Sequence, residues 1–467
     1  MKLTARDLEK IPHREFRNRE ALAHSAVKGV STDSRTTQPG DLFIALRGES
    51  FDGHRFVGAA FAAGAVAAVV EEGFDPAHVA GKPLILVRNT SPALGALARI
   101  YRDRFRIPFL AVGGSNGKTT TKEMITKVLG EKYNVLSTEG NLNNHIGVPM
   151  TLFRLNRKHE VAVIEIGTNH PGEIAELCRT LAPTHGVITN IGREHLEFFG
   201  SLDGVAEEEG ELFKSLSSPA GGTAIVGADD PRISMAARPV KRKLTYGFQS
   251  RSASVRGRRV VLDGEGRASF EFRSAAMKRW HGVQLVIPGK HNAMNALSAA
   301  AAGVVFHVPP SQISSALESC RPVSRRMETL SIGGVTILND TYNANPDSAR
   351  AALETLASLS VPGKKIAVLA DMLELGIHAD EEHAEVGKEA AALRIDYVLT
   401  HGDLAKHIHD AAGIPGALHY DQKNMLAEYL AELVTPGDAV LVKGSRGMYM
   451  EDIIAFLKER LRPARTA

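Results

Sequence analysis

The stretch Phe109-Leu-Ala-Val-Gly-Gly-Ser-Asn-Gly-Lys-Thr-Thr-Thr121 predicts a phosphate-binding loop between a buried strand and a helix. The apolar residues 109–112 lead into a turn that contains three glycines, and a helical pattern follows. Glycines allow backbone N–H groups to curl around phosphate oxygens, and the positive end of the helix dipole strengthens the attraction. The chain is therefore expected to bind ATP.

Two side chains of this loop have specific expected partners. Lys118 is placed to reach the β- and γ-phosphates of ATP, and the Thr119 hydroxyl is placed to reach Mg²⁺. The common motif has a glycine where this chain has Val112, so the loop is a shorter variant. The alternative is a glycine-rich turn that contains Gly-Lys-Thr by chance. The predicted nucleotide contacts in the loop are Gly113, Gly114, Ser115, Asn116, Gly117, Lys118, Thr119 and Thr120.

Length and composition restrict the class of protein. The chain has 467 residues, which is more than one hydrophobic core usually supports, so several domains are expected. Lysine and arginine number 56 against 53 acidic residues, and this near balance gives no reason to expect a nucleic-acid partner.

Cysteine usage and apolar runs favour a cytoplasmic enzyme. Cys178 and Cys320 lie far apart and form neither a disulfide framework nor a zinc motif, so both are expected in the core. No apolar run is long enough to span a bilayer, and the richest one, residues 58–70, is short. Charged residues rather than an apolar signal core follow the first methionine.

Three blocks of alternating strand and helix patterns predict three α/β domains, at residues 1–107, 108–323 and 324–467. The helical segment 92–104 and Pro108 mark the first boundary. The expected strands are 41–46, 65–70 and 84–87 in the first block, 161–166, 186–191 and 223–226 in the second, and 365–370, 396–400 and 438–442 in the third.

The strand patterns differ between parts of the chain. The second and third blocks contain continuous apolar strands that alternate with helices, which favours mostly parallel, Rossmann-like sheets covered on both faces. From residue 252 to 287 an Arg/Gly-rich alternation predicts antiparallel strands added to the central sheet. The first block reads as a smaller α/β domain.

Polar residues follow two strands of the central block. Glu165 ends one apolar strand and His195 follows the next, so both are expected beside Thr119 at one edge of a parallel sheet. Carboxylate and hydroxyl oxygens suit Mg²⁺, whereas imidazole is a less usual ligand. A solvated strand-end acid and a structural histidine are the alternatives.

Four further polar residues are candidates for nucleotide contacts. Asn292 and Asn295 open an alanine-rich helix and could hydrogen-bond an adenine edge, although ordinary capping of that helix explains them as well. Asp340 ends the strand 335–340 and could accept hydrogen bonds from ribose, and Arg326 could bridge phosphates. For both of these, a surface salt bridge is the alternative.

Several longer segments carry a resemblance that covers essentially the whole chain. They are Asp33-Ser-Arg35, Pro39 to Gly48 and Asp52-Gly-His54 in the first block, Gly113 to Thr120, Gly140-Asn-Leu-Asn-Asn144, Glu165-Ile-Gly167 and Asn190 to Glu197 in the second, and Asp340-Thr-Tyr-Asn-Ala-Asn-Pro-Asp-Ser348 with Asp371-Met-Leu-Glu-Leu-Gly376 in the third. Together they resemble the Mur ligases, which are ATP-dependent amide-forming enzymes of bacterial peptidoglycan synthesis. The last two segments are similar to those of the members that add D-alanyl-D-alanine to a UDP-N-acetylmuramoyl-tripeptide.

The resemblance implies roles for individual residues. Lys118, His195 and Arg326 would serve catalysis, and Thr119, Glu165 and His195 would hold Mg²⁺. Asn292 and Asn295 would face adenine, Asp340 the ribose and Arg326 the phosphates. The implied substrate-binding residues are Ser34, Arg35, Asn141, Asn144, Asn343, Asn345, Lys443, Ser445 and Arg446.

One position departs from the family pattern. Many members carry a lysine, carbamylated by CO₂, immediately before a Gly-Glu-Leu/Ile-Phe sequence, and Glu209 stands there in this chain. A glutamate keeps the negative charge but is shorter, so direct contact with Mg²⁺ would need a shifted backbone or a bridging water. We assign Glu209 to the metal site. The alternative is that Glu207, Glu208 and Glu209 form a solvated helix face.

The reaction implied by the resemblance begins with transfer of the ATP γ-phosphoryl group to the tripeptide carboxylate. The amine of D-alanyl-D-alanine then attacks the acyl phosphate, and phosphate leaves. The protein mainly positions the reactants and neutralises charge. A site split between domains predicts closure on binding. A monomer is expected. The alternatives are a Mur-type ligase for the third amino acid and a non-catalytic nucleotide-binding relative.

Overall fold

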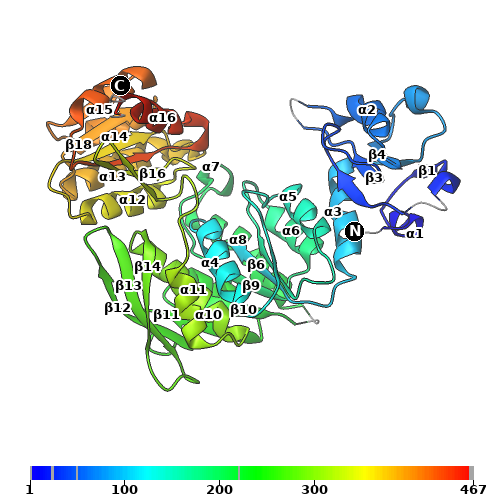
Figure 1. The fold of residues 1–467 in the computed structure, drawn as a ribbon, viewed down its shortest axis with the longest axis horizontal. Helices are drawn as coiled ribbons and strands as arrows, with labels where there is room; N and C mark the ends of the chain where they lie inside the picture. The colour runs from blue at the N-terminus through cyan, green and yellow to red at the C-terminus, as the bar shows by residue number, and fades with distance from the viewer. Residues whose placement is uncertain (1–2, 23–25, 49–50, 219–220, 462–467) are drawn as a thin grey trace, which may run out of the picture.

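The computed structural model describes residues 3–22, 26–48, 51–218 and 221–461, which form three α/β domains (Figure 1). Each domain is built around its own sheet, of five, nine and six strands in chain order. The N-terminal domain lies at one end of the molecule beside the central domain, and the C-terminal domain lies over the other side of the central domain (Figure 1). The expected three-domain α/β architecture is confirmed.

The N-terminal sheet has the strand order β1-β5-β4-β3-β2, and only β1 runs antiparallel to its neighbour. Its central strands are buried runs, as the sequence predicts, and α3 leads from this domain to the next. The elements are α1 (Ala5–Leu8), β1 (Glu15–Arg17), β2 (Gly29–Ser31), β3 (Asp41–Ile44), α2 (Val57–Ala62), β4 (Ala67–Glu71), β5 (Leu84–Val87) and α3 (Thr90–Arg102).

The central sheet has the order β14-β13-β12-β11-β10-β9-β6-β8-β7. Helices cover its faces, as continuous apolar strands require. The elements up to the last parallel strand are β6 (Phe109–Gly113), α4 (Lys118–Gly130), β7 (Val135–Ser137), α5 (Gly147–Phe153), β8 (Val161–Glu165), α6 (Glu173–Leu181), β9 (His185–Ile188), α7 (Leu196–Phe199), α8 (Leu202–Leu216), β10 (Thr223–Gly227), α9 (Pro231–Ala236) and β11 (Arg242–Gly247).

The Arg/Gly-rich segment extends this sheet with β12 (Val255–Leu262), β13 (Arg267–Ser274) and β14 (His281–Pro288). The β12–β13 and β13–β14 pairs are antiparallel, as predicted, while β12 runs parallel to β11. The turn between β12 and β13 reaches the C-terminal domain, because Ser360 N donates to Gly264 O over 2.8 Å.

Two helices complete the central domain, α10 (His291–Val305) and α11 (Pro310–Glu318). The alanine-rich α10 packs against α4 because its small side chains allow a close approach. A Cβ atom at Gly303 would lie 2.7 Å from Val128 Cγ1. This packing brings the first turn of α10 beside the phosphate loop.

The C-terminal sheet has the order β15-β16-β20-β17-β18-β19 and is parallel except for the β15–β16 hairpin. The predicted Rossmann-like, doubly wound pattern is thus present with one added antiparallel strand. The elements are β15 (Glu328–Ile332), β16 (Val335–Asp340), α12 (Pro346–Ser358), β17 (Lys365–Ala370), η4 (Gly376–His378), α13 (Ala379–Ala392), β18 (Tyr397–His401), α14 (Ala405–Ala412), β19 (Ala417–Tyr420), α15 (Lys423–Leu433), β20 (Ala439–Lys443) and α16 (Glu451–Arg460).

Two strand edges face each other across the central and C-terminal domains. The parallel strands β6, β8 and β9 end beside one another at the phosphate loop. In the C-terminal domain, β16 and β20 end together at Asp340 and Lys443. Open α/β sheets bind ligands at the carboxyl ends of their strands, so this geometry favours one site between the two domains.

Both cysteines lie in the central domain and are buried without a disulfide. Burial raises the pKa of Cys178 to about 12 and that of Cys320 to about 11. The expectation that they are core residues is confirmed. Across the part of the chain that the structure describes, no helix is long and apolar enough to cross a membrane.

Candidate active site

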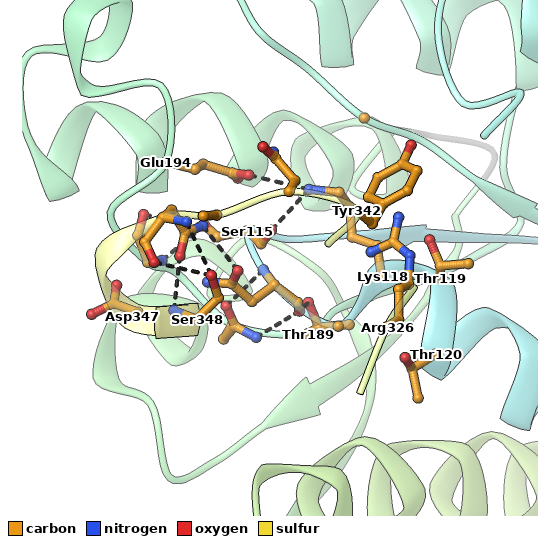
Figure 2. A pocket seen from close by; sticks show the side chains of 18 of the residues that line it. Ser115, Lys118, Thr119, Thr120, Thr189, Glu194, Arg326, Tyr342, Asp347 and Ser348 are labelled. Atoms are coloured by element: carbon orange, nitrogen blue, oxygen red, sulfur yellow. Dashed lines mark hydrogen bonds and ion pairs between the residues drawn. The ribbon is translucent and has the colours of Figure 1, made fainter. Parts of the chain in front are cut away.

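A cavity of about 780 Å³ lies between the central and C-terminal domains. It brings together residues that are far apart in the sequence. The residues singled out from the sequence that line it are Ser115, Asn116, Gly117, Lys118, Thr119, Thr120, Asn141, Asn144, Glu165, His195, Asn292, Asn295, Arg326, Asp340, Asn343, Asn345, Lys443, Ser445 and Arg446. Figure 2 shows part of this lining, with Lys118 near the middle.

The phosphate loop depends on glycines at two positions. Gly114 and Gly117 have φ angles of 110° and 76°, which side chains disfavour. Space is also lacking, because a Cβ atom at Gly114 would lie 2.3 Å from Thr189 Oγ1 and one at Gly117 would lie 2.8 Å from Asn295 Oδ1. The loop is pinned to the chain after β9, since Asn116 N donates to Asn190 Oδ1 over 3.0 Å. The backbone of the loop is therefore fixed before any ligand binds.

Lys118 is surrounded by negative charge. Its ammonium group donates to Ser115 O over 3.1 Å and to Glu194 Oε2 over 3.3 Å (Figure 2). Burial by itself would lower the pKa of Lys118, but the carboxylates of Glu194, Glu209 and Glu165 outweigh it and raise the pKa. Lys118 is thus held as a cation at the phosphate loop.

Buried carboxylate oxygens around the loop provide a donor set that suits Mg²⁺. Glu165 accepts hydrogen bonds from Thr119 Oγ1 at 3.1 Å and from Asn143 Nδ2 at 2.8 Å, both through Oε1. Its Oε2 atom, like Oε1 of Glu194, is buried without a hydrogen-bond partner in the described structure. Such orphaned oxygens fit a hard cation that also takes water and phosphate oxygens. Within the described ranges, no three His, Cys, Asp or Glu side chains gather as a metal site by themselves.

Glu209 lies beneath the phosphate loop and does not line the cavity. It is fully buried on α8, and its Oε2 atom accepts the N–H of Gly114 over 2.6 Å. Burial raises the pKa of Glu209 to about 8, although Lys118 acts in the opposite direction. The side chain contacts the loop backbone and is not among the side chains that line the cavity. The carboxylate instead supports the loop from below.

The alternative of a solvated helix face is wrong for two of the three consecutive glutamates. Glu207 is exposed, but Glu208 and Glu209 are buried. Glu208 accepts hydrogen bonds from the backbone of Gly172 at 2.7 Å and Ile174 at 2.8 Å, at the start of α6. A carboxylate at a helix N-terminus is stabilised there by the dipole and the free N–H groups.

His195 precedes α7 and lies at the interface of the two domains. Its φ angle of 48° is in the left-handed region, and its side chain is largely buried. Nδ1 lies 2.6 Å from Oε2 of Glu374 in the C-terminal domain, and Nε2 lies 4.0 Å from Oε2 of Glu194. The His195 ring lowers the pKa of Glu374 below its usual value.

The two asparagines at the start of α10 hydrogen-bond to each other. Asn295 Nδ2 donates to Asn292 Oδ1 over 2.9 Å, and Asn292 Nδ2 donates to Pro288 O over 2.7 Å. Both side chains are buried at the cavity wall. These hydrogen bonds hold both amides in fixed orientations.

Arg326 and Asp340 have partners within the C-terminal domain. The Arg326 guanidinium carbon lies 3.9 Å from the centre of the Tyr342 ring, and the two side chains lie together in Figure 2. Lys443 Nζ donates to Asp340 Oδ2 over 2.5 Å and to Asn343 O over 2.9 Å. A carboxylate neutralised in this way still has lone pairs for further donors.

The remaining predicted residues of the C-terminal domain shape the wall of the cavity. Ser445 Oγ accepts the N–H of Leu373 over 2.9 Å, and Arg446 is exposed at the rim. Asn345 caps α12 through Ser348 N at 2.9 Å, and its Nδ2 donates to Asn116 Oδ1 over 2.9 Å. The last bond connects the C-terminal domain directly to the phosphate loop.

The other substrate candidates lie in different surroundings. Asn141 and Asn144 are exposed at the cavity wall, and Asn144 Oδ1 also accepts the N–H of Gly147 at the start of α5 over 2.9 Å. Ser34 and Arg35 belong to the N-terminal domain and do not line the cavity. There Arg35 pairs with Asp33 over 2.6 Å.

The cavity lining also contains residues that the sequence did not single out, and five polar ones stand out: Asn143, Asn190, Glu194, Tyr342 and Asp347. They all fall inside segments that carry the family resemblance or beside one of their residues. The only sequence signal for these residues was their position beside predicted site residues. Local sequence does not say which of several polar neighbours points into the cavity.

Comparison with known proteins agrees with this geometry. Residues 26–102 match the catalytic domain of the Mur ligase family, residues 112–303 the Mur ligase middle domain, and residues 325–446 the Mur ligase glutamate ligase domain. A Bacillus subtilis protein named UDP-N-acetylmuramoyl-tripeptide–D-alanyl-D-alanine ligase is 38% identical over 448 residues, which cover 93% of this chain and 94% of the relative. This chain belongs to the Mur ligase family.

Further relatives span this Mur ligase almost from end to end. The Escherichia coli protein of the same name is 36% identical and covers 94% of the chain, with 95% of its own length matched. A crystal structure of MurF from Acinetobacter baumannii matches with a TM-score of 0.90 and 31% identity, over 98% of this chain and 99% of that one. MurF from Thermotoga maritima in complex with ADP matches with a TM-score of 0.83 and 29% identity, over 93% and 98% of the two chains.

Proposed function

We propose that this Mur ligase joins D-alanyl-D-alanine to UDP-N-acetylmuramoyl-tripeptide: the γ-phosphoryl group of ATP passes to the tripeptide carboxylate, which releases ADP, and the amine then displaces phosphate from the acyl phosphate. The observation that carries the proposal is the shared cavity, in which Lys118 and Thr119 of the central domain face Arg326 and the Asp340–Lys443 pair of the C-terminal domain. Relatives that carry the name of this activity match more than nine-tenths of the chain.

The roles within the cavity follow from charge and position. ATP would lie with its phosphates on the loop 113–120 and its adenine near Asn292 and Asn295. Asp340 would accept hydrogen bonds from the ribose, and Arg326 would contact the phosphates through its planar donor fork. Asn343, Asn345, Ser445 and Arg446 line the side from which the amine substrate would enter.

Mg²⁺ fits the residues beside the loop. Thr119 and Glu165 would be its protein ligands, because the free Oε2 atom of Glu165 is buried and the hydroxyl of Thr119 is already directed at the same carboxylate. His195 would complete the site from the turn before α7, and Glu209 would act through a water or through the position of Gly114. The ion would neutralise charge on the phosphates during transfer.

The chain's own groups account for the first chemical step. A carboxylate and a triphosphate repel each other, and Lys118 and Arg326 supply positive charge from opposite domains. Donors held in place before binding stabilise the charge of the transferring group without further reorganisation. Closure of the two domains would exclude water, which would otherwise hydrolyse the acyl phosphate.

The N-terminal domain would bind the UDP-sugar, with Ser34 and Arg35 among its contacts, while Asn141 and Asn144 would contact the peptide. We place the domain boundaries at 107/108 and 323/324, supported by three separate sheets whose strands fall at 15–87, 109–288 and 328–443. A monomer is proposed because one chain supplies both sides of the cavity.

The test is a ligation assay with purified protein, ATP and Mg²⁺. UDP-N-acetylmuramoyl-tripeptide and D-alanyl-D-alanine should give an amide product, identified by mass spectrometry, with one ADP per product. The control reaction offers UDP-N-acetylmuramoyl-dipeptide and a single free amino acid as the two substrates. Activity on this control alone, or ADP release that does not depend on the amine, would refute the proposal.

A further inference from the structure

The antiparallel strands β12, β13 and β14 carry a surplus of positive charge. Residues 255–284 contain seven lysines and arginines against three acids, a surplus of four, whereas the whole chain has a surplus of three. Two of these acids, Asp263 and Glu265, lie between β12 and β13 and each pair with Arg267 at 2.8 Å. The other six cations therefore share one acid of this segment, Glu271. These six form what we call the basic surface: Arg256, Arg258, Arg259, Arg273, Lys278 and Arg279.

One side of these strands is open to solvent. Buried and more exposed residues alternate along β13, and the helices α10 and α11 pack against the buried side. Val255 and Ser274 oppose each other on that side, so the next pair, Arg256 and Arg273, lies on the open side. The strands form the outer part of the central domain, away from the N-terminal domain (Figure 1). No residue of the basic surface lines the cavity.

The charges of the basic surface are poorly neutralised. Arg256 and Arg273 are both exposed and stand directly opposite each other on neighbouring strands, where like charges destabilise the sheet. Arg258 and Arg259 share the Glu271 carboxylate, at 2.6 and 3.4 Å. Arg256, Lys278 and Arg279 form no ion pair or hydrogen bond with any described residue. The fold thus keeps a repulsion that an anionic partner would relieve.

Trp280 indicates which anionic partner fits. It lies one residue before β14, and the guanidinium carbons of Arg258 and Arg273 lie 4.0 and 5.2 Å from its ring centre. Cations already occupy the ring, so it is not free to stack on a nucleic-acid base. An indole among basic side chains instead suits the boundary between lipid headgroups and water. Val261, 60% exposed and opposite Ser269 in the same antiparallel pair, adds apolar surface.

We propose that the basic surface and Trp280 dock this chain on a membrane that contains anionic phospholipids. Lipid phosphates would neutralise the opposed arginines, and the indole would lie at the level of the headgroups. An open sheet side matches a planar partner, and the cavity lies elsewhere. The docking is peripheral and reversible, and it does not depend on the reaction proposed above.

The expected strength follows from the number of charges. A basic residue near an anionic bilayer typically contributes about fivefold to the affinity. Removing two of them should therefore weaken binding about 25-fold. Salt screens such an attraction, so binding should fall steeply as the ionic strength rises.

The experiment compares full-length wild type with two double variants. Arg256→Gln with Arg273→Gln removes the opposed pair, and Arg157→Gln with Arg460→Gln is the matched control. Arg157 precedes β8 and Arg460 ends α16, and both are exposed without an ion pair to any described residue. Each double variant removes two positive charges from exposed arginines.

Binding is measured by co-sedimentation with vesicles of phosphatidylglycerol and phosphatidylcholine in equal parts, and with vesicles of phosphatidylcholine alone. Phosphatidylcholine with brominated acyl chains, added to the first mixture, tests contact through quenching of fluorescence. Because Trp280 is the one tryptophan of the chain, the quenching reports this position only. Urea unfolding without vesicles, followed by circular dichroism, measures stability.

Wild type should bind the vesicles that contain phosphatidylglycerol, release them at high salt, and show quenching of Trp280. The Arg256/Arg273 variant should bind about 25-fold more weakly, and the control less than about twofold. The Arg256/Arg273 variant should also be at least as stable as wild type in urea, because its substitutions remove a repulsion. A loss of binding with no loss of stability separates docking from a role in the fold.

Several results would overturn the proposal. They are equal binding to phosphatidylcholine alone, no binding to either vesicle, binding without quenching of Trp280, and an equal loss of affinity in the control. Lower stability of the Arg256/Arg273 variant would assign these arginines to the fold. Tighter binding of single-stranded RNA than of the anionic vesicles at the same salt concentration would assign the surface to nucleic acid.

Discussion

The buried carboxylate of Glu209 predicts an unusual dependence of stability on pH. Its pKa is raised from 4.5 to about 8 in the folded protein, chiefly by burial. In the unfolded chain the group ionises near the lower value. Between these two pH values the folded state holds a proton that the unfolded state has lost. The free energy of unfolding is therefore highest at low pH, as far as Glu209 is concerned, and it falls as the pH rises to about 8.

Glu209→Gln should remove this dependence. Glutamine resembles the protonated acid and keeps an oxygen that can accept the N–H of Gly114. Each pH unit in the window is worth about 1.4 kcal/mol, and from pH 6 to the folded pKa there are about two units. Between pH 6 and 9 wild type should therefore lose about 3 kcal/mol of unfolding free energy relative to the variant.

The assay is urea unfolding in the absence of Mg²⁺ and nucleotide, followed by tryptophan fluorescence. Trp280 is the one tryptophan of the chain and lies beside β14 in the central domain, so the signal reports the domain that contains Glu209. Glu207→Gln on the exposed side of α8 is the matched control and should follow wild type. If wild type and Glu209→Gln keep a constant difference from pH 6 to 9, burial does not hold the proton and the reasoning is refuted.

Three other substitutions test the site and its interface. Lys118→Met should reduce kcat/KM for ATP at least 100-fold, about 3 kcal/mol, because it removes a cation from the phosphates and the nearest cation from Glu194. An effect below tenfold in a coupled ADP assay would contradict this. Gly117→Ala should abolish detectable binding of a fluorescent ATP analogue, because its Cβ atom would lie 2.8 Å from Asn295 Oδ1 at a φ of 76°; unchanged affinity would mean that the loop adapts. Arg193→Met removes the ion pairs of this side chain with Asp347 and Glu382 of the C-terminal domain. The radius of gyration of the ligand-free protein, measured by X-ray scattering, should therefore increase. A scattering profile equal to that of wild type would contradict this.

Local patterns were sufficient for the strands and the phosphate loop. The apolar runs at 84–87 and 365–370 coincide with β5 and β17, because a strand buried on both faces is a continuous apolar segment. The ends of most other predicted strands differ from the observed ends by one or two residues. The strand expected at 186–191 stops at Ile188, since the chain must turn there to pin the phosphate loop.

Interactions between domains could not be predicted from local sequence patterns. Glu374 lies in a segment that marked the resemblance, but its contact with His195 depends on how the C-terminal domain docks. Lys443 was expected to meet substrate, and the structure pairs it with Asp340, which lies 103 positions earlier. The side to which Glu209 points follows from the packing of α8 under β6, and the sequence of the helix alone also allowed a solvated face.

The burial of both cysteines has a practical consequence for observing domain motion. With pKa values of about 12 and 11, the native thiols stay protonated at neutral pH and are shielded from solvent. Maleimide dyes need an accessible thiolate, so the wild-type chain should remain almost unlabelled. One new surface cysteine on α13 and another at the exposed position 207 of α8 would then carry the only fluorophores. Energy transfer between them would test, molecule by molecule, whether the central and C-terminal domains of this ligase open and close.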